Sequence, residues 1–255
     1  MAGKSQEALV TDQFGPRAAA YVASPVHAAG VDLDRIEALV CARMPGRVLD
    51  LGCGGGHVSY RAASHAGEVV AYDLSPEMLE AVRRTAGERG FANIVTESGA
   101  AEVLPFPEAS FDMVLSRYSA HHWHDFRKGL AEARRVLKPD GLAVFADAVT
   151  PDHPLLDTFL QSIELLRDPS HVRDYTRAEW QQALRAAGFD PAAPVLHRVP
   201  LEFDAWVKRM RTPDLHVEAI RSLQRWMPSE VAAHFDVRPD GSFTLDAMTI
   251  EAAPA

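Results

Sequence analysis

The sequence predicts an α/β protein with a doubly wound, mostly parallel sheet. Three observations lead to this fold class. An apolar strand at residues 48–51 runs into a glycine-rich turn and then a helix, the first corner of a nucleotide-binding α/β unit. A second strand ends on an acidic residue, Asp73, roughly 20 residues after that turn. Strand-like and helix-like segments then alternate along the chain, as in sheets built from strand–helix–strand units.

Length and composition indicate a globular protein with one large domain or two small ones. The chain has 255 residues, 47% hydrophobic and 24% charged. Its net charge of −9 argues against binding to nucleic acid phosphates and against docking on anionic membranes. No apolar run approaches the ~18 residues of a transmembrane helix, and residues 1–21 lack a signal-peptide core. With only Cys41 and Cys53, we expect a reducing, cytoplasmic compartment.

The first 44 residues predict helical segments that precede the sheet. Residues 5–21 are polar and then alanine-rich, and residues 32–43 carry apolar side chains at helical spacing. Pro45 and Gly46 end the second helix. The segment could form a lid over the glycine turn, or it could simply cap the sheet; both interpretations remain open.

The spacing of the glycine turn indicates the kind of ligand. A dinucleotide fingerprint, G-x-G-x-x-G, would place its third glycine where His57 stands. Instead, Asp50 ends the strand and is followed by Gly52, Gly54 and Gly56. A carboxylate repels phosphate and attracts ammonium. The turn therefore favours a zwitterionic or cationic nucleoside over a pyrophosphate, the alternative being a tight turn that binds no ligand.

The second strand, residues 68–73, ends on a carboxylate that can accept hydrogen bonds from two adjacent ribose hydroxyls. Ser75 as N-cap and Pro76 at the first helical position predict a helix there. Met78 lies one turn into this helix and could pack on an adenine ring. Asp73 could instead belong to the helix cap, but Ser75 already fills that position.

The remaining elements follow from apolar periodicity and turn residues. Further strands are expected at residues 93–96, 111–116, 142–146, 195–203 and 242–251. Further helices are expected at 126–137, 152–173 with an interruption at 168–173, 176–187 and 205–235. Residues 138–141, Lys-Pro-Asp-Gly, predict a turn between a helix and the fifth strand.

These motifs together resemble the class I S-adenosylmethionine-dependent methyltransferases. The glycine turn resembles their first motif, in which the loop holds the methionine part of the cofactor, and the Asp-x-Ser-x-x-Met stretch from Asp73 to Met78 is similar to theirs. The resemblance implies a Rossmann-like, seven-stranded sheet in the order 3-2-1-4-5-7-6, with one antiparallel strand and helical insertions. It also implies a single domain with a helical lid at 1–44, a cofactor-binding core at 45–150, and completing strands with acceptor-site helices at 151–255.

The resemblance assigns cofactor contacts residue by residue. The implied set is Asp50, Gly52, Cys53, Gly54, Gly56, Asp73, Leu74, Met78, Ala100, Ala101, Ser116, Arg117 and Tyr21. If the N-terminal segment forms a lid over the cofactor, the candidates for contact with the cofactor are Gln13, Phe14, Tyr21 and His27. The family usually has an aspartate where Ala100 stands, so the adenine amino group would rely on backbone carbonyls or on Glu102.

Residues 117–124 directly follow the fourth strand, at the edge where open α/β sheets bind ligands. Their three histidines lack the i, i+4 spacing of a helical metal site and have no cysteine nearby, so no metal is expected. A similar Arg-Tyr/Phe-x-x-His-His stretch occurs in the ubiquinone/menaquinone-type C-methyltransferase-like group (methyltransferase type 11 domain). We expect His122, His121 or Tyr118 as a base. Arg117 would orient the acceptor or stabilise an enolate. The alternative is that these side chains pack or cap.

The expected activity is transfer of the methyl group of S-adenosylmethionine to a small-molecule acceptor, with phenolic or quinol-like compounds as one candidate class. Two alternatives stay open: a dinucleotide-dependent oxidoreductase, and a protein that holds the cofactor without transferring its methyl group. No nucleic acid partner, no membrane insertion and no metal are expected. The sequence does not specify the acceptor, the methylated atom or the oligomeric state.

Overall fold

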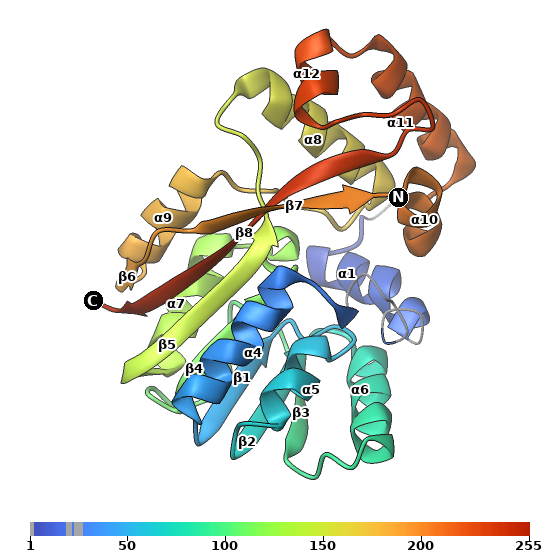
Figure 1. Cartoon of the computed structure of the whole chain (residues 1–255). Coiled ribbons are helices and arrows are strands. Elements are labelled where there is room, and N and C mark those ends of the chain that lie inside the picture. The colour runs from blue at the N-terminus through green and yellow to red at the C-terminus, as the bar shows by residue number, and fades with distance from the viewer. Residues whose placement is uncertain (1–2, 19–21, 23–27) are drawn as a thin grey trace.

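One mixed sheet organises the molecule (Figure 1), a computed structural model that describes residues 3–18, 22 and 28–255. Within those residues the sheet has eight strands: β1 (Arg47–Leu51), β2 (Glu68–Asp73), β3 (Ile94–Ser98), β4 (Phe111–Arg117), β5 (Leu137–Ala148), β6 (Phe189–Pro191), β7 (Val195–Leu201) and β8 (Phe243–Pro254). The helices are α1 (Gln6–Phe14), α4 (Val31–Arg43), α5 (His57–Ala63), α6 (Pro76–Glu88), α7 (Phe126–Val136), α8 (Pro154–Arg167), α9 (Arg177–Ala186), α10 (Phe203–Met210), α11 (Asp214–Trp226) and α12 (Ser229–His234). Short 3₁₀ turns, η1 (Gly15–Arg17) and η2 (Ala120–His122), follow α1 and β4.

The strand order confirms the predicted fold class. The sheet runs β3-β2-β1-β4-β5-β8-β6, with β7 also paired to β8. The pairs among β1 to β5 are parallel, whereas β8 is antiparallel to β5. The prediction of seven strands differs in one respect. The strand expected at 195–203 is β7, and an additional short strand that was not predicted, β6, precedes it; both pair with β8. Pro194 lies in the gap between them and has no N–H to give to the ladder.

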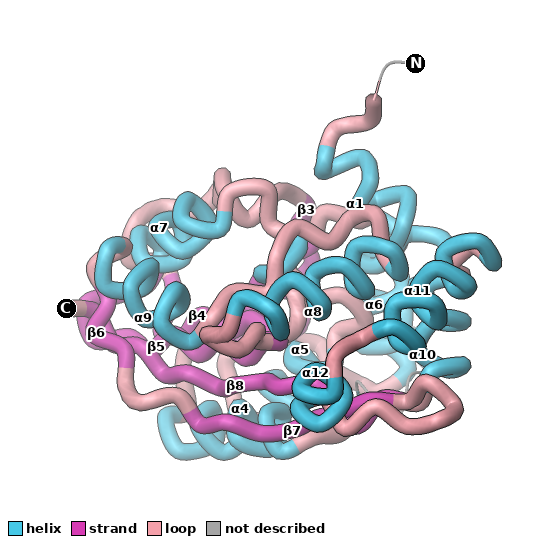
Figure 2. The backbone as a smooth tube through the Cα atoms, turned by 90° about the horizontal axis from the view of Figure 1, so that it is seen from above, coloured by secondary structure: helices cyan, strands magenta, loops and turns pink. Residues whose placement is uncertain are grey.

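Helices cover both faces of the parallel part of the sheet. On one face α4 and α5 pack on β1, β2, β4 and β5 through a core that includes Ile36, Val40 and Val58. On the other face α7 and α9 pack through Leu130 and Trp180. Figure 2, which views the molecule from above, shows α4 and the α7–α9 pair on opposite sides of the strands. This double cover makes the central strands apolar on both faces.

A helical extension stands beyond the carboxyl ends of the parallel strands. Helices α8, α10, α11 and α12 pack around the first half of β8 and the end of β7 in a core that includes Leu160, Trp206 and Phe243 (Figure 1). The single helical stretch expected at 205–235 is divided into three helices. Arg211 adopts a left-handed conformation after α10, and Pro213 and Pro228 precede α11 and α12. Proline cannot continue a helix that precedes it, so these positions set the breaks.

The turn predicted at residues 138–141 is wrong in its details. Strand β5 begins at Leu137, immediately after α7, where it pairs with Phe111. The register then moves to the pair of Met113 with Leu142, so residues 138–141 bulge out of the ladder. Lys138 Nζ donates to the Asp112 carboxylate at 2.6 Å, which fixes the bulge to β4.

Candidate active site

The glycine turn between β1 and α5 is held open toward the carboxyl edge of the sheet. Gly52 and Gly54 have φ angles of +74° and +49°, a region that glycine adopts without steric cost. A Cβ on Gly52 would lie 1.8 Å from Ser119 Oγ, whereas one on Gly54 would meet no atom within 4 Å. Gly52 therefore permits the close approach of the loop after β4, and Gly54 presents its backbone to open space.

Two acidic side chains stand at neighbouring strand ends beside this turn. Asp50 is 1% exposed, and its carboxylate accepts from Ser59 Oγ at 2.6 Å. Burial outweighs that hydrogen bond and raises the pKa of Asp50 to about 7. Asp73 accepts from the N–H of Gly54 at 2.8 Å and of Ser75 at 2.9 Å, and burial raises its pKa too. Each of the two carboxylate oxygens of Asp73 accepts one of these hydrogen bonds and has a further lone pair that can accept from a ligand.

A first pocket, of about 1040 Å³ including its open mouth, lies over the turn and collects most of the predicted cofactor residues. Those that line it are Asp50, Gly52, Cys53, Gly54, Asp73, Leu74, Met78, Ala101 and Arg117. The predicted catalytic residues Tyr118 and His122 line it as well. The cap geometry predicted for α6 is confirmed, because Ser75 Oγ accepts from the N–H of Met78 at 3.2 Å.

The structure does not bring the remaining predicted contacts into this lining. Gly56 is the N-cap of α5, where a Cβ would lie 2.8 Å from the Tyr60 ring. Ser116 is buried within β4, and the Ala100 carbonyl accepts from Tyr72 Oη at 3.2 Å. Tyr21 and His27 lie outside the described residues.

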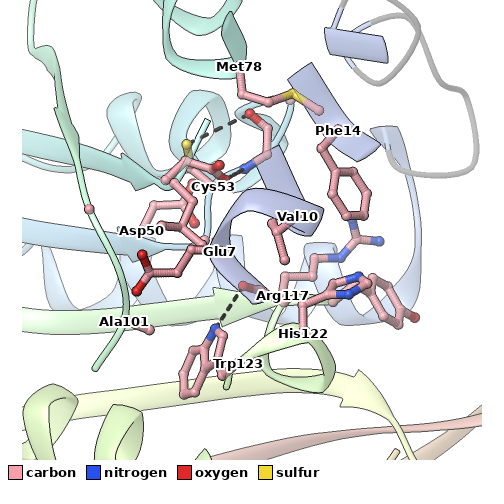
Figure 3. Close-up of a pocket in the computed structure, with 18 of the residues that line it drawn as sticks. Glu7, Val10, Phe14, Asp50, Cys53, Met78, Ala101, Arg117, His122 and Trp123 are labelled. Atoms are coloured by element: carbon pink, nitrogen blue, oxygen red, sulfur yellow. Dashed lines mark hydrogen bonds between the residues drawn. The ribbon is translucent and has the colours of Figure 1, made fainter. Parts of the chain in front are cut away.

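Helix α1 covers the first pocket, and sequence analysis did not identify most of its contacts. Glu7, Val10 and Phe14 point into the same space as Asp50 and Met78 (Figure 3). Val10 is the one buried residue of α1, so the helix has no apolar periodicity that would have marked its inner face. The Gln13 side chain lies elsewhere and donates to the carbonyl of Met210 on α10 at 3.4 Å.

The same helix is tied to His122. Gln6 Nε2 donates to the carbonyl oxygens of His122, at 3.2 Å, and Ser170, at 2.6 Å. The Phe14 ring meets the His122 ring edge-on, with centroids 5.0 Å apart. Helix α1 and the predicted base are therefore in direct contact.

The two adjacent histidines have opposite protonation. Burial alone would lower the pKa of His121, but the Asp147 carboxylate, 2.6 Å from its Nδ1, raises it to about 9. Burial, and then the charge of His121, lower the pKa of His122 to about 4. His122 Nδ1 lies 3.1 Å from the Ser170 carbonyl, which can only accept, so Nδ1 carries the hydrogen and Nε2 the lone pair. At neutral pH His122 can accept a proton and His121 cannot.

A second pocket adjoins the first at this histidine. Phe14, Arg117, Tyr118 and His122 line both. The Arg117 guanidinium lies across the junction, and its Nε donates to Asp32 of α4 in an ion pair whose side chains are 6% and 3% exposed. The charge of Arg117 is thus largely matched within the protein.

Tyr118 stands at the same junction in a left-handed conformation, with φ of +50°. Arg117 lies over its ring at 4.9 Å. Burial, and then the negative charge of Asp32, raise the pKa of Tyr118 well above its ordinary value. At neutral pH the phenol is therefore a hydrogen-bond donor rather than a base.

Polar side chains distant in sequence line the second pocket. His121, the remaining predicted catalytic residue, lies here and not in the first pocket. The polar residues that sequence analysis did not assign to a site are Asp32, Glu164, Arg167, Asp168, Asp174, His197, Arg198 and Arg209. The sequence contains one indication of these residues, the interruption of the helix pattern at 168–173. That interruption did not indicate a function.

The first pocket is acidic. Glu7, Asp50, Asp73 and Glu102 bring carboxyl groups to its lining, whereas the guanidinium of Arg117 is already paired with a carboxylate. Such a lining attracts ammonium or sulfonium groups and repels phosphates.

Two further properties concern metals and membranes. In the part of the chain that the structure describes, no three side chains of metal-binding type converge on a common point. Among the same residues, every helix is too short or too polar to span a bilayer.

A glycine turn between two acidic strand ends, at the carboxyl edge of a sheet with this order, is typical of α/β proteins that bind nucleosides. Comparison with known proteins identifies the family of this chain. The methyltransferase domain family matches residues 49–145. Protein YafE of Escherichia coli, described as uncharacterized, is 44% identical over 200 residues, which cover 78% of this chain and 97% of YafE.

Two further relatives are named as methyltransferases. The uncharacterized methyltransferase YcgJ of Bacillus subtilis is 38% identical over 78% of this chain and 79% of YcgJ. The YcgJ crystal structure superposes with a TM-score of 0.81 and 34% identity, over 86% of this chain and 97% of that one. Demethylmenaquinone methyltransferase of Chlorobaculum parvum is 34% identical over 43% of this chain and 44% of that protein. The chain belongs to the S-adenosylmethionine-dependent methyltransferase family.

Proposed function

We propose that the first pocket binds S-adenosylmethionine and that the methyl group is transferred to a small molecule in the second pocket. The observation that carries this proposal is the acidic lining over an open glycine turn. A positively charged sulfur nucleoside matches that lining, whereas the pyrophosphate of a dinucleotide does not. The open space at the Gly54 backbone accommodates the close approach that such a ligand needs.

The predicted contacts divide by the part of the cofactor that they would meet. Asp50 and the turn at Gly52, Cys53 and Gly54 would hold the ammonium and carboxylate of the methionine moiety. Asp73 would accept from both ribose hydroxyls. Leu74, Met78 and Ala101 would enclose the adenine, with Glu102 within the same lining.

Three other predicted residues, Gly56, Ala100 and Ser116, would support the site from outside its lining. On this proposal the whole chain works as one domain. Residues 1–44 form the lid, 45–150 the cofactor-binding core, and 151–255 the completing strands and acceptor-site helices. The contacts of Gln6 and Phe14 with His122 support the assignment of the lid.

His122 is proposed as the base. When bound, the sulfonium of the cofactor supplies an electrophilic methyl group. His122 Nε2 would take the proton that the acceptor loses, while its Nδ1–H continues to donate to Ser170. Asp168 and Asp147 nearby would offset part of the burial and of the His121 charge that disfavour a positive charge on this ring. His121, already protonated beside Asp147, would be a positioning residue.

The acceptor is proposed to be an aromatic or quinol-like compound. The partial match to a demethylmenaquinone methyltransferase supports this class. Phe14, Tyr118 and Trp206 line the second pocket and suit a flat ring. Arg117 and Tyr118 would orient the ring at the junction, next to the methyl group.

Calorimetry and isotope transfer test the proposal. Titration of the purified protein with S-adenosylhomocysteine should give saturable binding, and titration with NAD should give none. Tritium from labelled S-adenosylmethionine should then enter members of a panel of phenols, quinols and amines. Binding of NAD in preference to the adenosyl ligand would overturn the proposal in favour of an oxidoreductase. Adenosyl binding without transfer to any compound of the panel would instead indicate a cofactor-binding protein.

A further inference from the structure

Asp174 carries a buried carboxyl group, one oxygen of which has no hydrogen-bond partner among the residues that the structure describes. It lies between α8 and α9 and is 2% exposed. In the described part of the chain, the side chain of Gln161 forms two hydrogen bonds with the backbone of Asp174. The Asp174 N–H donates to Gln161 Oε1 at 3.1 Å, and the Asp174 carbonyl accepts from Gln161 Nε2 at 2.8 Å. Within the described residues, Oδ2 of the carboxyl has no hydrogen-bond partner. Native proteins rarely leave such a group unsatisfied, so its presence requires an explanation.

The carboxyl borders the second pocket, where its charged neighbours are already paired. His121 of η2 pairs with Asp147 of β5. Glu164 of α8 pairs with Arg167 of the same helix at 3.3 Å. Neither cation forms an ion pair with Asp174. A buried carboxyl without a cation favours its neutral, protonated form.

The electrostatic surroundings agree with this protonation. Burial is the main cause that raises the pKa of Asp174, to about 8, and Glu164 and Asp147 raise it further. His121 and Arg167 act in the opposite direction but are outweighed. At neutral pH the group is therefore a carboxylic acid that can donate one hydrogen bond.

We propose that Asp174 anchors the methyl acceptor by donating a hydrogen bond from its protonated carboxyl, and that the acceptor presents an uncharged carbonyl or hydroxyl oxygen there. This inference rests on the proposed function, because it assigns the second pocket to the acceptor. Asp174 and His122 both line that pocket, and His122 also lines the first. An aromatic molecule held at Asp174 by one oxygen is thereby oriented with another part facing His122 and the cofactor.

The pocket favours this class of ligand over charged ones. An ammonium acceptor would need an ionised carboxylate at Asp174, which is neutral. A carboxylate acceptor would need a cation, and Arg117, Arg167 and Arg198 already pair with carboxylates of the protein. Arg209, the other arginine of this pocket, also has a partner within the protein. The Trp206 ring, 1% exposed and 4.9 Å from the Arg167 guanidinium, provides an apolar wall for a ring.

A matched pair of probes tests the inference by calorimetry with S-adenosylhomocysteine saturating. The first probe, 1-acetonaphthone, carries a carbonyl that can only accept, and the second, 1-naphthylmethylamine, carries an ammonium. The wild type should bind the ketone at least tenfold more tightly than the amine. Asp174→Leu should weaken ketone binding at least tenfold, whereas Asp174→Asn, whose amide can donate, should keep it within threefold. The exposed substitution Asp190→Asn serves as the control for loss of a carboxyl.

A pH profile supplies a readout that a merely structural role would not change. Ketone affinity of the wild type should fall as the pH rises from 7 to 9, because Asp174 loses the proton that it donates. In Asp174→Asn the affinity should be flat over that range. This comparison needs only the near-isosteric variant, so it holds even where Asp174→Leu does not fold.

Several results would overturn the inference. They are no ketone binding by the wild type, tighter binding of the amine, equal binding by Asp174→Leu, or loss of binding in Asp174→Asn. Each is read with the S-adenosylhomocysteine titration. If that ligand binds and the ketone results fail, the role of Asp174 is wrong while the proposed function stands. If that ligand does not bind the wild type, the proposed function itself fails.

Discussion

At the scale of single residues, neighbouring positions in the sequence take different chemical roles because their partners differ. His121 faces a carboxylate and is held protonated. His122 faces a carbonyl oxygen and a positively charged neighbour, and it is held neutral. The sequence nominates both as bases, and only the partners distinguish them. A general base must be unprotonated at the working pH, which favours His122.

Replacement of His122 by alanine should separate catalysis from cofactor binding. Turnover should fall by about 10²–10⁴-fold, the usual contribution of a positioned base. The affinity for S-adenosylhomocysteine should change little, because the proposed role of the imidazole is to accept a proton from the acceptor and not to hold the cofactor. Single-turnover methyl transfer and calorimetry measure the two effects. An equal loss in both would show that His122 only shapes the cofactor pocket.

Replacement of Asp73 by alanine should weaken cofactor binding. Loss of the hydrogen bonds that the ribose hydroxyls donate to a charged carboxylate costs about 1–3 kcal/mol, which calorimetry with S-adenosylhomocysteine can measure. Asp73 also holds the N–H groups of Gly54 and Ser75, so a structural loss must be separated. With 2′-deoxy-S-adenosylhomocysteine the variant should lose less affinity than with the parent ligand. Equal losses for both ligands would assign Asp73 a structural role alone.

Sequence analysis could predict those site residues whose positions are fixed by the backbone of a single short segment. Gly52 and Asp73 are readable because a strand–turn–helix corner fixes their places a few residues apart. Asp174 and Glu7 are not, because they reach their pockets through contacts with segments distant in the chain. Their neighbours in sequence carry no record of those contacts.

At the scale of secondary structure, periodicity predicts the elements and proline decides how they are divided. The strands at β1, β2 and β4 and the helices at α4, α6 and α9 lie within a few residues of expectation. The helical stretch expected at 205–235 is interrupted instead, and the short strand β6, ahead of the strand expected at 195–203, was not predicted. Pro213 and Pro228 stand at the interruptions of the helical stretch, and Pro194 separates β6 from β7. A prediction from apolar spacing alone gives too little weight to these prolines.

Helix α1 should depend on Gln6 for its closed position over the first pocket. Gln6→Ala removes two hydrogen bonds to the carbonyls of His122 and Ser170, each contributing about 1 kcal/mol. The amides of α1 should then exchange faster with solvent, and S-adenosylhomocysteine should bind several-fold more weakly. Hydrogen exchange by mass spectrometry and calorimetry test this.

Gln13→Ala provides a matched control for α1, since Gln13 contacts α10 instead of the histidine stretch. Its substitution should leave the orientation of His122 unchanged. Unaltered exchange of α1 in Gln6→Ala would show that apolar contacts of Val10 and Phe14 are enough to hold the lid.

At the scale of the whole molecule, the sheet predicts where ligands bind, but not what the second pocket contains. The carboxyl edge is a general consequence of strand direction, so the position of the first pocket follows from the predicted fold. The second pocket is assembled from α4, η2, α8 and β7, which bring Asp32, His121, Glu164 and His197 together from distant parts of the chain. Only the folded arrangement relates these residues.

That buried polar assembly should make the stability of the whole protein fall with pH above neutrality. The folded-state pKa values of His121, about 9, and Asp174, about 8, lie above their unfolded values. Between pH 7 and 9 the folded state therefore binds more protons than the unfolded state, and its stability decreases as the pH rises. His122 and His171, with pKa values lowered to about 4 and about 2, act only below pH 6.5, where their effect is to destabilise the fold in acid.

Chemical denaturation at pH 7, 8 and 9 measures this dependence. The wild type should lose about 3–4 kcal/mol of unfolding free energy over that range, an amount set by the size of the two pKa shifts. His121→Gln should be less stable at pH 7, because it leaves Asp147 buried without its cation, yet its stability should vary much less from pH 7 to 9. Asp174→Asn should reduce the slope by a smaller share. A wild-type stability that is constant or rises over this range would show that neither group retains its proton in the folded state, and it would remove the basis for treating Asp174 as a donor.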